Sequence, residues 1–397
     1  MNEPSHVMTS SNQPVTPRAR VIAFYLPQFH PIPENDSWWG AGFTEWTNVV
    51  SAQPLFRGHV QPHLPADLGF YDLRLPDVRV DQAMLAQRHG IEGFCYWHYW
   101  FGGRRILERP FEEVLASGSP GFPFMLGWAN QSWSGIWHGD PDRTLIEQPY
   151  PGIADHEAHF KYLLRAFKDE RYIRVDGKPA FYIYRPREIP DPLEMIRLWR
   201  RMAREAGLPG LYLLAEDMLV DRRRGPIEGF DATVQVNLPR IRPPARLHRL
   251  KTRLRKGLVV YDYDRWLAQF VTDEVRQLDV HPCVIPNWDN TARSGRRGMV
   301  LAGSTSESFR LQVRRACEAI EEKPRDRRFI FIKSWNEWAE GNYLEPDREH
   351  GKSYLEALAA ETLTGSPNER ESGLERSRDT SSPRRGATQG LRSRGRA

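Results

Sequence analysis

The residues best suited to chemistry form one block, KSWNEWAEGNYLEPD, at positions 333–347. Within it Glu337 and Glu340 are three positions apart, so a helical turn at this point places both side chains on one face. Cleavage of a glycosidic bond needs two carboxyl groups, one that protonates the leaving oxygen and one that acts as base or nucleophile. A separation of about 5–5.5 Å accompanies retention of configuration, and the spacing suits that distance. We therefore predict that Glu337 and Glu340 are catalytic.

The surroundings of this pair predict that its two members differ in protonation. Mutual repulsion and the neighbouring tryptophans Trp335 and Trp338 should raise the pKa of one carboxyl and keep it protonated near neutrality. Glu345 is a third carboxylate nearby, and we assign it to binding a sugar hydroxyl. Most pairs of this spacing are solvated pairs on a helix surface, but the flanking tryptophans favour a buried site here.

Tryptophans and amides also gather elsewhere, because eleven of the 13 tryptophans fall in segments that follow predicted strands. An indole can stack on the apolar face of a sugar ring, while amides, histidines and carboxylates bind the hydroxyls at its edge. Each tryptophan taken alone is also compatible with a place in the core. The clustering beside polar residues predicts a glycan-binding cleft. The predicted contacts, besides Glu345, are Glu45, Trp46, Trp97, His98, Trp128, Asn130, Trp133, Asn237, Trp288, Asn290, Trp335, Asn336 and Trp338.

Alternating strand and helix patterns predict the elements that position these residues. Short apolar runs that predict strands begin at Arg20, Ile91, Phe122, Lys178, Leu211, Phe230, His281 and Arg328. Helical patterns cover residues 77–89, 109–117, 154–168, 191–206, 261–279, 304–322 and 352–362. Eight repeats with strands apolar on both faces predict an α/β fold, a closed (β/α)8 barrel, with a doubly wound open sheet as the alternative. In such a barrel the strand ends meet at one face.

Two segments depart from this alternation. Residues 218–229 are too short and too rich in Pro and Gly for an ordinary helix. The loop from His30 to Pro76 is long and rich in Pro, Gly and Trp, and loops of that length are usually functional. We expect this loop to cap the mouth of the barrel.

Composition predicts one folded domain with disordered ends. Of the 397 residues, 40% are hydrophobic and 27% are charged, which is typical of a globular chain. We predict a catalytic domain over residues 18–362, a disordered N-terminus over 1–17 and a disordered basic tail over 363–397. The three cysteines, Cys95, Cys283 and Cys317, have no metal-like spacing and predict buried thiols. The absence of a signal peptide or long apolar run predicts a cytoplasmic protein.

The net charge of +5 does not predict a nucleic-acid partner, because much of it lies in the tail. Residues 366–397 contain eight arginines against four acids, typical of a solubilising tail, with contact to an anionic membrane or nucleic acid as the alternative. A second basic segment, Arg240 to Lys256, holds eight Lys/Arg and no acid. It is either a solvated insertion or a contact with anionic lipids or a lipid-linked glycan at the inner membrane face.

Several motifs together resemble a known family. They are YLPQFH at 25–30, FTEWTNV at 43–49, GFCYWHYWF at 93–101, WANQSW at 128–133, NWDNTAR at 287–293 and WNEWAEGNYLEPD at 335–347. These motifs resemble the WbsX-type proteins of surface-polysaccharide gene clusters, which are similar in turn to glycoside hydrolase family 99, the endo-α-mannosidases and endo-α-mannanases. The resemblance covers about residues 20–360.

The resemblance implies a (β/α)8 barrel without a metal or other cofactor that acts with retention. It implies that Glu337 assists the 2-hydroxyl of the substrate to attack the anomeric carbon, forming a 1,2-anhydro sugar, and that Glu340 is first acid and then base. The substrate must then carry a 2-hydroxyl trans to the leaving group, as α-mannosides do. Tyr25 is a further sugar contact by this likeness.

Three functions follow. The first is an enzyme that cleaves or transfers an α-linked glycosyl unit of an oligosaccharide or polysaccharide, free or lipid-linked, in cell-surface (O-antigen-type) polysaccharide metabolism. The second is a glycosyltransferase that uses a sugar nucleotide, since WbsX-type proteins are commonly labelled glycosyltransferases. No GxGxxG motif or other convincing nucleotide site supports it. The third is a catalytically silent glycan-binding protein.

Overall fold

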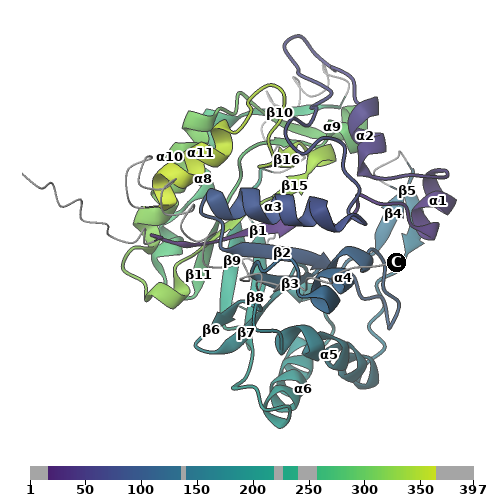
Figure 1. The fold of residues 1–397 in the computed structure, drawn as a ribbon, viewed down its shortest axis with the longest axis vertical. Coiled ribbons are helices and arrows are strands. Elements are labelled where there is room, and N and C mark those ends of the chain that lie inside the picture. The colour runs from purple at the N-terminus through teal and green to yellow at the C-terminus, as the bar shows by residue number, and fades with distance from the viewer. Residues whose placement is uncertain (1–16, 136–139, 219–226, 240–256, 364–397) are drawn as a thin grey trace, which may run out of the picture.

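The computed structural model describes residues 17–135, 140–218, 227–239 and 257–363. Parallel strands close into a barrel in which β3 pairs with β7 to complete the ring, so the predicted (β/α)8 barrel is confirmed and the open sheet is excluded (Figure 1). In the order of the ring the strands are β3 (Phe124–Trp128), β2 (Gly93–His98), β1 (Arg20–Tyr25), β14 (Phe329–Ile332), β11 (Val280–Val284), β9 (Ala232–Val236), β8 (Tyr212–Met218) and β7 (Lys178–Ile183). All eight predicted strands are present.

Helices surround this barrel. They are α3 (Pro76–Arg88), α4 (Arg109–Ser117), α5 (Ile153–Phe167), α6 (Pro192–Glu205), α8 (Tyr263–Phe270), α10 (Ser306–Ile320) and α11 (Ser353–Thr362). Six of them agree with the predicted helices within two residues. The long helix predicted over 261–279 is wrong, because the chain there forms the end of β10 (Val259–Asp262), then α8, then a 3₁₀ turn (Asp273–Arg276). Between the last two, Thr272 is extended and its hydroxyl donates to Gln235 Oε1 at 2.8 Å.

The alternation of side chains along each strand decides which strand residues face the barrel lumen. Phe24 points into the lumen, where its ring stacks on Trp97 at 4.8 Å between centroids and also contacts Tyr182. Its neighbour Tyr25 points the opposite way, toward Gln82 on α3. Only residues on the lumen side of a strand end can reach a cavity at the top of the barrel.

Smaller elements gather over the carboxyl ends of the strands. These are α1 (Pro33–Trp39), α2 (Glu45–Ser51), α9 (Thr291–Ser294), the hairpin β4 (Trp133–Gly135) and β5 (Asp140–Ile146), the strands β12 (Trp288–Asp289) and β13 (Met299–Ala302) beside β10, and the hairpin β15 (Asn336–Glu337) and β16 (Asn342–Tyr343) (Figure 1). The loop that follows β1 forms α1 and α2, and α2 contacts α9. It covers the barrel mouth, as we predicted.

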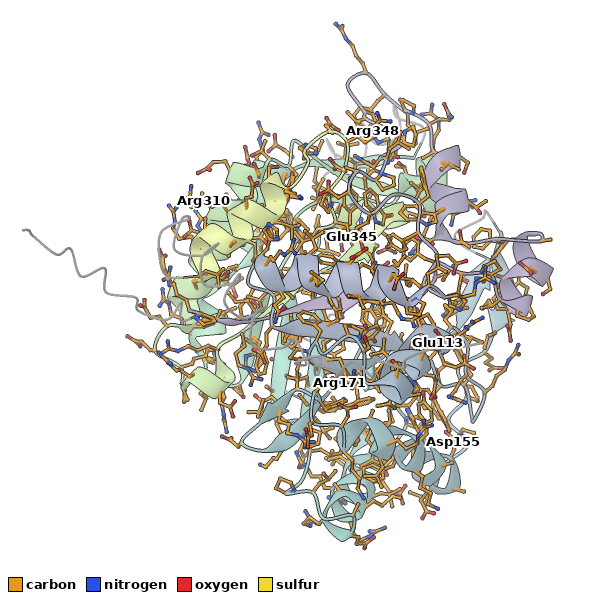
Figure 2. All side chains as sticks on the ribbon, viewed as in Figure 1. Glu113, Asp155, Arg171, Arg310, Glu345 and Arg348 are labelled. Carbon is orange, nitrogen blue, oxygen red and sulfur yellow. The ribbon has the colours of Figure 1, made fainter. Side chains whose placement is uncertain are left out.

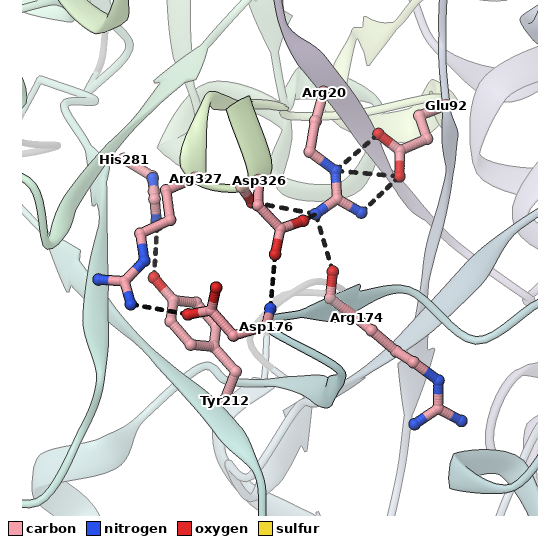
Figure 3. Close-up of polar contacts among 8 residues, drawn as sticks. All are labelled: Arg20, Glu92, Arg174, Asp176, Tyr212, His281, Asp326 and Arg327. Atoms are coloured by element: carbon pink, nitrogen blue, oxygen red, sulfur yellow. Dashed lines mark hydrogen bonds and ion pairs between the residues drawn. The ribbon is translucent and has the colours of Figure 1, made fainter. Parts of the chain in front are cut away.

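An ion cluster lies at the opposite, amino end of the strands (Figure 3). Arg20, the first residue of β1, donates to Glu92 at 2.6 Å and to Asp326 at 2.9 Å, and it also donates to the backbone carbonyl of Arg174 at 2.8 Å. Close by, Arg327 is paired with Asp176 at 2.8 Å. A short strand β6 (Arg174–Val175) pairs antiparallel with β7 at this end. The cluster therefore connects segments far apart in sequence below the barrel.

Several sequence predictions fall on residues that are not described. The predicted disordered ends lie outside the described residues except at Pro17 and Leu363, as do positions 219–226 of the irregular unit and the whole basic segment Arg240 to Lys256. The three cysteines are buried and free, as predicted. No helix among the described residues is long and apolar enough to span a bilayer.

Candidate active site

A cavity of about 610 Å³ opens at the carboxyl ends of the barrel strands. The ends of β2, β7 and β14 contribute Trp97, Tyr184 and Lys333 to its wall, and the covering elements contribute Trp133 and Trp288. Aromatic rings beside charged groups are the usual lining of a site that binds a polar organic molecule.

Glu337 and Glu340 both line this cavity and are buried. The chain leaves β14, forms β15 with Glu337 at its end, and enters a 3₁₀ turn (Trp338–Glu340) that presents Glu340. The turn ends at Gly341, whose φ of +52° suits glycine. A Cβ at this position would lie 2.7 Å from Cβ of Asp289, so only glycine lets the turn pack this closely against β12.

Arg293, on α9, joins three carboxylates at the cavity wall. Its Nη1 donates to Glu340 at 2.7 Å, its Nη2 donates to Glu337 at 3.3 Å, and its Nε donates to Glu45 at 2.8 Å. The two acids of the block and the acid at the start of α2 therefore share one guanidinium. Because one positive charge faces three carboxyl groups, the group as a whole favours retention of a proton.

Burial and, after it, the nearby Glu337 charge raise the pKa of Glu340 to about 7 against the opposing effect of Arg293. Burial likewise raises the pKa of Glu45, and Arg293 opposes that rise. Glu337 is held from a second side, because Trp97 Nε1 donates to its Oε1 at 3.1 Å. The site thus combines a carboxyl group that can carry a proton near neutrality, as predicted for one member of the pair, with an oriented acceptor.

The structure brings seven of the residues singled out in the sequence to this cavity. They are Glu45, Trp97, Trp133, Trp288, Asn290, Glu337 and Glu340. The Asn290 side-chain oxygen already accepts a hydrogen bond from the Met299 amide at 2.7 Å, so it also fixes β13.

Three predicted sugar contacts lie on the helix-facing side of their strands instead. The Tyr25 hydroxyl donates to Gln82 Oε1 at 2.6 Å, and the His98 ring nitrogen lies 2.9 Å from that of His159 on α5. Trp128 packs against His159 with 4.8 Å between ring centroids. Strand alternation turns all three away from the lumen, so direct sugar contact does not follow for them.

Three predicted asparagine contacts are also buried away from the cavity lining, where they bind backbone groups. Asn130 donates to the carbonyl of Arg185 at 2.8 Å, and Asn237 donates to that of Phe270 at 3.1 Å. Asn336 both accepts from the amide of Leu26 at 2.7 Å and donates to its carbonyl at 3.0 Å. These amides fix the loops of the site because buried backbone groups require partners.

Glu345 is not available for the sugar hydroxyl that we assigned to it. Its carboxylate accepts from Trp338 Nε1 at 2.6 Å, from Gln82 Nε2 at 2.7 Å and from the Tyr71 hydroxyl at 2.9 Å. It lies close to α3, as Figure 2 shows. Burial raises its pKa to about 7. Through Trp338 it supports the turn that carries Glu340.

The remaining predicted tryptophan contacts pack around the same turn. Trp338 stacks on Tyr343 with 3.9 Å between ring centroids and contacts Trp46 at 5.5 Å. Trp46 donates to the carbonyl of Tyr71 at 2.9 Å. Trp335 is fully buried against Phe94. These rings form a core beneath α2 rather than a sugar platform.

Sequence reasoning missed several residues of the cavity, above all Arg293, Lys333, Tyr184 and Arg185. A signal was present for two of them. Arg293 closes the NWDNTAR motif after a predicted strand, and Lys333 is a charged residue at the end of the apolar run FIFI. Among the described residues, no group of three or more His, Cys, Asp or Glu side chains is arranged to hold a metal ion.

Comparison with solved structures agrees with the barrel. A protein described as "Glycoside hydrolase-like protein" superimposes with a TM-score of 0.59 at 15% identity, covering 92% of this chain and 98% of that one. The GH99 endo-alpha-mannosidase from Bacteroides thetaiotaomicron in complex with BIS-TRIS-propane gives a TM-score of 0.49 at 14% identity, over 91% of this chain and 99% of its own. At these identities the first match bears on the fold alone.

Sequence comparison identifies relatives and a family. The uncharacterized protein WxcX of Xanthomonas campestris pv. campestris strain B100 is 38% identical over 364 residues, covering 89% of this chain and 51% of that protein. Its counterpart in strain ATCC 33913 is 39% identical over the same length. The chain thus spans about half the length of these curated relatives. The model of the family described as "Glycosyltransferase WbsX" matches residues 21–358, and the chain therefore belongs to the WbsX family.

Proposed function

We propose that this protein is a carbohydrate-active enzyme that cleaves or transfers an α-linked glycosyl unit with retention of configuration. The observation that carries the proposal is the joint position of Glu337 and Glu340, which bind one guanidinium, that of Arg293, at the wall of an aromatic cavity. The pKa of Glu340, raised by burial to about 7, supports its role as the acid.

The proposed reaction uses the 2-hydroxyl of the substrate as its nucleophile. Glu337 accepts the proton of this hydroxyl while the hydroxyl oxygen bonds to the anomeric carbon. Glu340 gives its proton to the leaving oxygen as the glycosidic bond breaks. Water or an acceptor hydroxyl then opens the anhydro sugar. Glu340 takes the proton of this incoming hydroxyl, and Glu337 returns its proton to the 2-hydroxyl.

This route restricts the substrate to sugars whose 2-hydroxyl is trans to the leaving group, as in α-mannosides. Two inversions at the anomeric carbon give overall retention. The rings of Trp97, Trp133 and Trp288 support a sugar-binding role for the cavity because each can stack on a pyranose face. We propose an oligosaccharide or polysaccharide of the cell surface as the substrate.

The test is turnover by Glu337→Gln and Glu340→Gln on a panel of α-mannosyl and related oligosaccharides. We expect each variant to lose at least about 10³-fold in kcat while oligosaccharide binding survives, because each removes a proton transfer but keeps the side-chain volume. Glu349→Gln, which alters an exposed carboxylate close in sequence, is the matched control and should keep full activity. Proton NMR of the first product anomer checks stereochemistry, and an inverted product would refute the assigned roles.

A glycosyltransferase that uses a sugar nucleotide is the second candidate, and the description of the family favours it. The two candidates differ in whether turnover needs a nucleotide donor. Activity on simple glycosides without any nucleotide supports our first proposal, whereas strict dependence on a nucleotide sugar supports the second. If the wild type turns over neither substrate class and both Gln variants bind oligosaccharide equally well, the protein is a glycan-binding module.

We also propose that the glycan is presented on a lipid and that the basic segment Arg240 to Lys256 contacts the anionic membrane surface. Its eight cations support this, since each surface-near cation contributes about 1 kcal/mol to such binding. Liposome flotation compares the wild type with a variant in which Arg249, Lys251, Arg253 and Arg255 are changed to Gln. We expect the variant to lose most of its binding to anionic liposomes, and equal binding removes the idea.

A further inference from the structure

Lys333, the residue that follows β14, places a buried ammonium group at the cavity wall. The residue is only 6% exposed and lines the cavity. Its closest carboxylate partner is Glu216, whose Oε2 lies 4.0 Å from Nζ, beyond hydrogen-bonding distance. Within the described part of the chain, Nζ has no hydrogen-bond acceptor. An ammonium has three N–H donors, and burying it without acceptors is costly.

The charge of Lys333 is nevertheless maintained. Burial lowers the pKa of its ammonium, but the Glu216 carboxylate together with Tyr184, Cys283 and Glu340 outweighs that effect and keeps the pKa above its ordinary value. Glu216 accepts a hydrogen bond from the Tyr182 hydroxyl, is buried and does not line the cavity. The ammonium is therefore charged, close to the cavity and available to an acceptor that enters it.

Arg185 supplies a second cation to the same wall. Its guanidinium carbon lies 4.4 Å from the centroid of the Tyr184 ring, and Lys333 Nζ lies 5.4 Å from that same centroid. Tyr184, Arg185 and Lys333 all line the cavity. Two cations thus flank one aromatic ring. Arg185 also lies 3.9 Å from Glu188 Oε1, and the third cation of the cavity, Arg293, pairs with three carboxylates.

We propose that Lys333 and Arg185 form a subsite for an anionic substituent of the glycan, a carboxylate or a phosphate, so that the substrate is an acidic glycoside. The inference rests on the proposed function for the presence of a glycan, but it assigns a substrate class that the catalytic pair does not. Hydrogen bonds between charged partners are stronger than those between neutral ones, and an anionic oxygen supplies the acceptor that Lys333 lacks.

The subsite lies close to the proposed reaction. Lys333 is four residues before Glu337, and its charge lowers the pKa of Glu340. Electrostatic influence of this kind requires proximity in a buried site. The anionic group therefore belongs to a sugar unit beside the cleaved bond rather than to a remote part of the chain.

The test is a binding experiment that does not depend on turnover. Methyl α-mannoside, its uronic acid and its 6-phosphate are titrated separately against the full-length Glu340→Gln variant and followed by ligand-observed NMR. We expect at least one acidic sugar to bind roughly ten- to a hundredfold more tightly than the neutral one. Preference for the uronic acid identifies a carboxylate substituent, and preference for the phosphorylated sugar identifies a phosphate.

Variants then assign the preference to the subsite. Lys333→Met in the same background should reduce the ratio of acidic to neutral affinity to near one, while affinity for the neutral sugar changes less than about threefold. Arg185→Gln should reduce the ratio partially. Lys352→Met is the matched control, because it alters a half-exposed lysine that pairs with Asp67, and it should leave the ratio unchanged.

A loss of folding must be separated from a loss of the subsite, since Lys333→Met leaves Glu216 without its counter-ion. The double variant Lys333→Met with Glu216→Gln removes both charges and should melt near the parent temperature while showing the same lost preference. Three results overturn the inference. They are equal binding of neutral and acidic sugars by the Glu340→Gln parent, absence of binding by that parent, and an undiminished preference for the acidic sugar in the double variant. If the protein prefers acidic sugars but the wild type shows no turnover, the subsite is supported and only the enzyme proposal is refuted.

Discussion

Arginine-centred ion clusters lie at both ends of the barrel, and they differ in burial and in charge balance. At the amino end, Arg20 binds Glu92 and Asp326, whose side chains are 30% and 45% exposed. At the carboxyl end, Arg293 binds Glu45, Glu337 and Glu340, whose side chains are at most 10% exposed. Arginine–carboxylate pairs therefore occur in a partly exposed environment at the amino end and in a buried one at the carboxyl end.

The consequences for protonation are opposite. Near the amino end, the hydrogen bond from Arg327 lowers the pKa of Asp176, because this exposed carboxylate has a cation of its own. At the carboxyl end, burial and the charge of Glu337 raise the pKa of Glu340 to about 7, although Arg293 is in contact. An excess of acids in a buried place, rather than the presence of arginine, makes a carboxyl group suited to proton transfer.

The largest expected effect comes from removing the arginine of the cluster at the carboxyl end of the barrel. Arg293→Met leaves three buried carboxyl groups without their counter-ion, so we expect kcat/KM to fall by about 10³-fold or more and the free energy of unfolding to fall by about 3–5 kcal/mol. Steady-state kinetics and urea unfolding measure the two quantities. Activity within tenfold of wild type would show that the proposed roles of Glu337 and Glu340 do not depend on Arg293.

The pH dependence should separate the two clusters by sign. Glu340 must be protonated to act as an acid, so we expect kcat/KM to fall tenfold per pH unit above about 7, the value to which its pKa is raised. The stability of the fold should also depend on the protonation of Glu340. Because the folded pKa lies above the ordinary value of 4.5, the site destabilises the fold progressively as pH rises from 4.5 through 7.

At the lower cluster, the one at the amino end of the barrel, the pH dependence of stability should have the opposite sign. The lowered pKa of Asp176 stabilises the fold above the ordinary value of 3.8, and this contribution is lost as the pH falls below it. Thermal melts of wild type and Glu340→Gln between pH 2 and 8 provide the comparison. Both proteins should lose stability as the pH falls below 3.8, and the Gln variant should be more stable than wild type at pH 8. A wild-type melting temperature that rises from pH 5 to 8 as steeply as that of the variant would contradict the raised pKa of Glu340.

The smallest effect on turnover is expected at the lower cluster. Arg20→Met removes hydrogen bonds to Glu92, Asp326 and a backbone carbonyl, so we expect the free energy of unfolding to fall by about 1–3 kcal/mol with kcat unchanged. Arg74→Met, which removes a half-exposed pair with Asp72, is the control and should change stability by less than about 1 kcal/mol. A large loss of kcat in Arg20→Met at full folding would show that the two ends are coupled.

Local patterns in the sequence were enough to predict the kind of fold. Eight apolar runs separated by helical patterns predicted eight parallel strands and favoured a closed barrel, since each repeat buries its apolar side only against its neighbours. The pairing of β3 with β7 then excluded the open sheet. The helix predicted over 261–279 was wrong because Thr272 binds Gln235, a residue that local periodicity does not include. The sequence also indicated Glu337 and Glu340, whose spacing and aromatic neighbours are local features.

Which side chains face the cavity became clear from the packed barrel. In a strand buried on both faces, lumen-facing and helix-facing residues are equally apolar, so the sequence could not tell Trp97, which reaches the cavity, from Tyr25, which does not. The partners of the acids depend on packing between α2, α9 and the 3₁₀ turn at Trp338–Glu340, which are far apart in sequence. Arg293 and Lys333 acquire their roles there, because burial and charge at a point in space depend on every segment that meets at it.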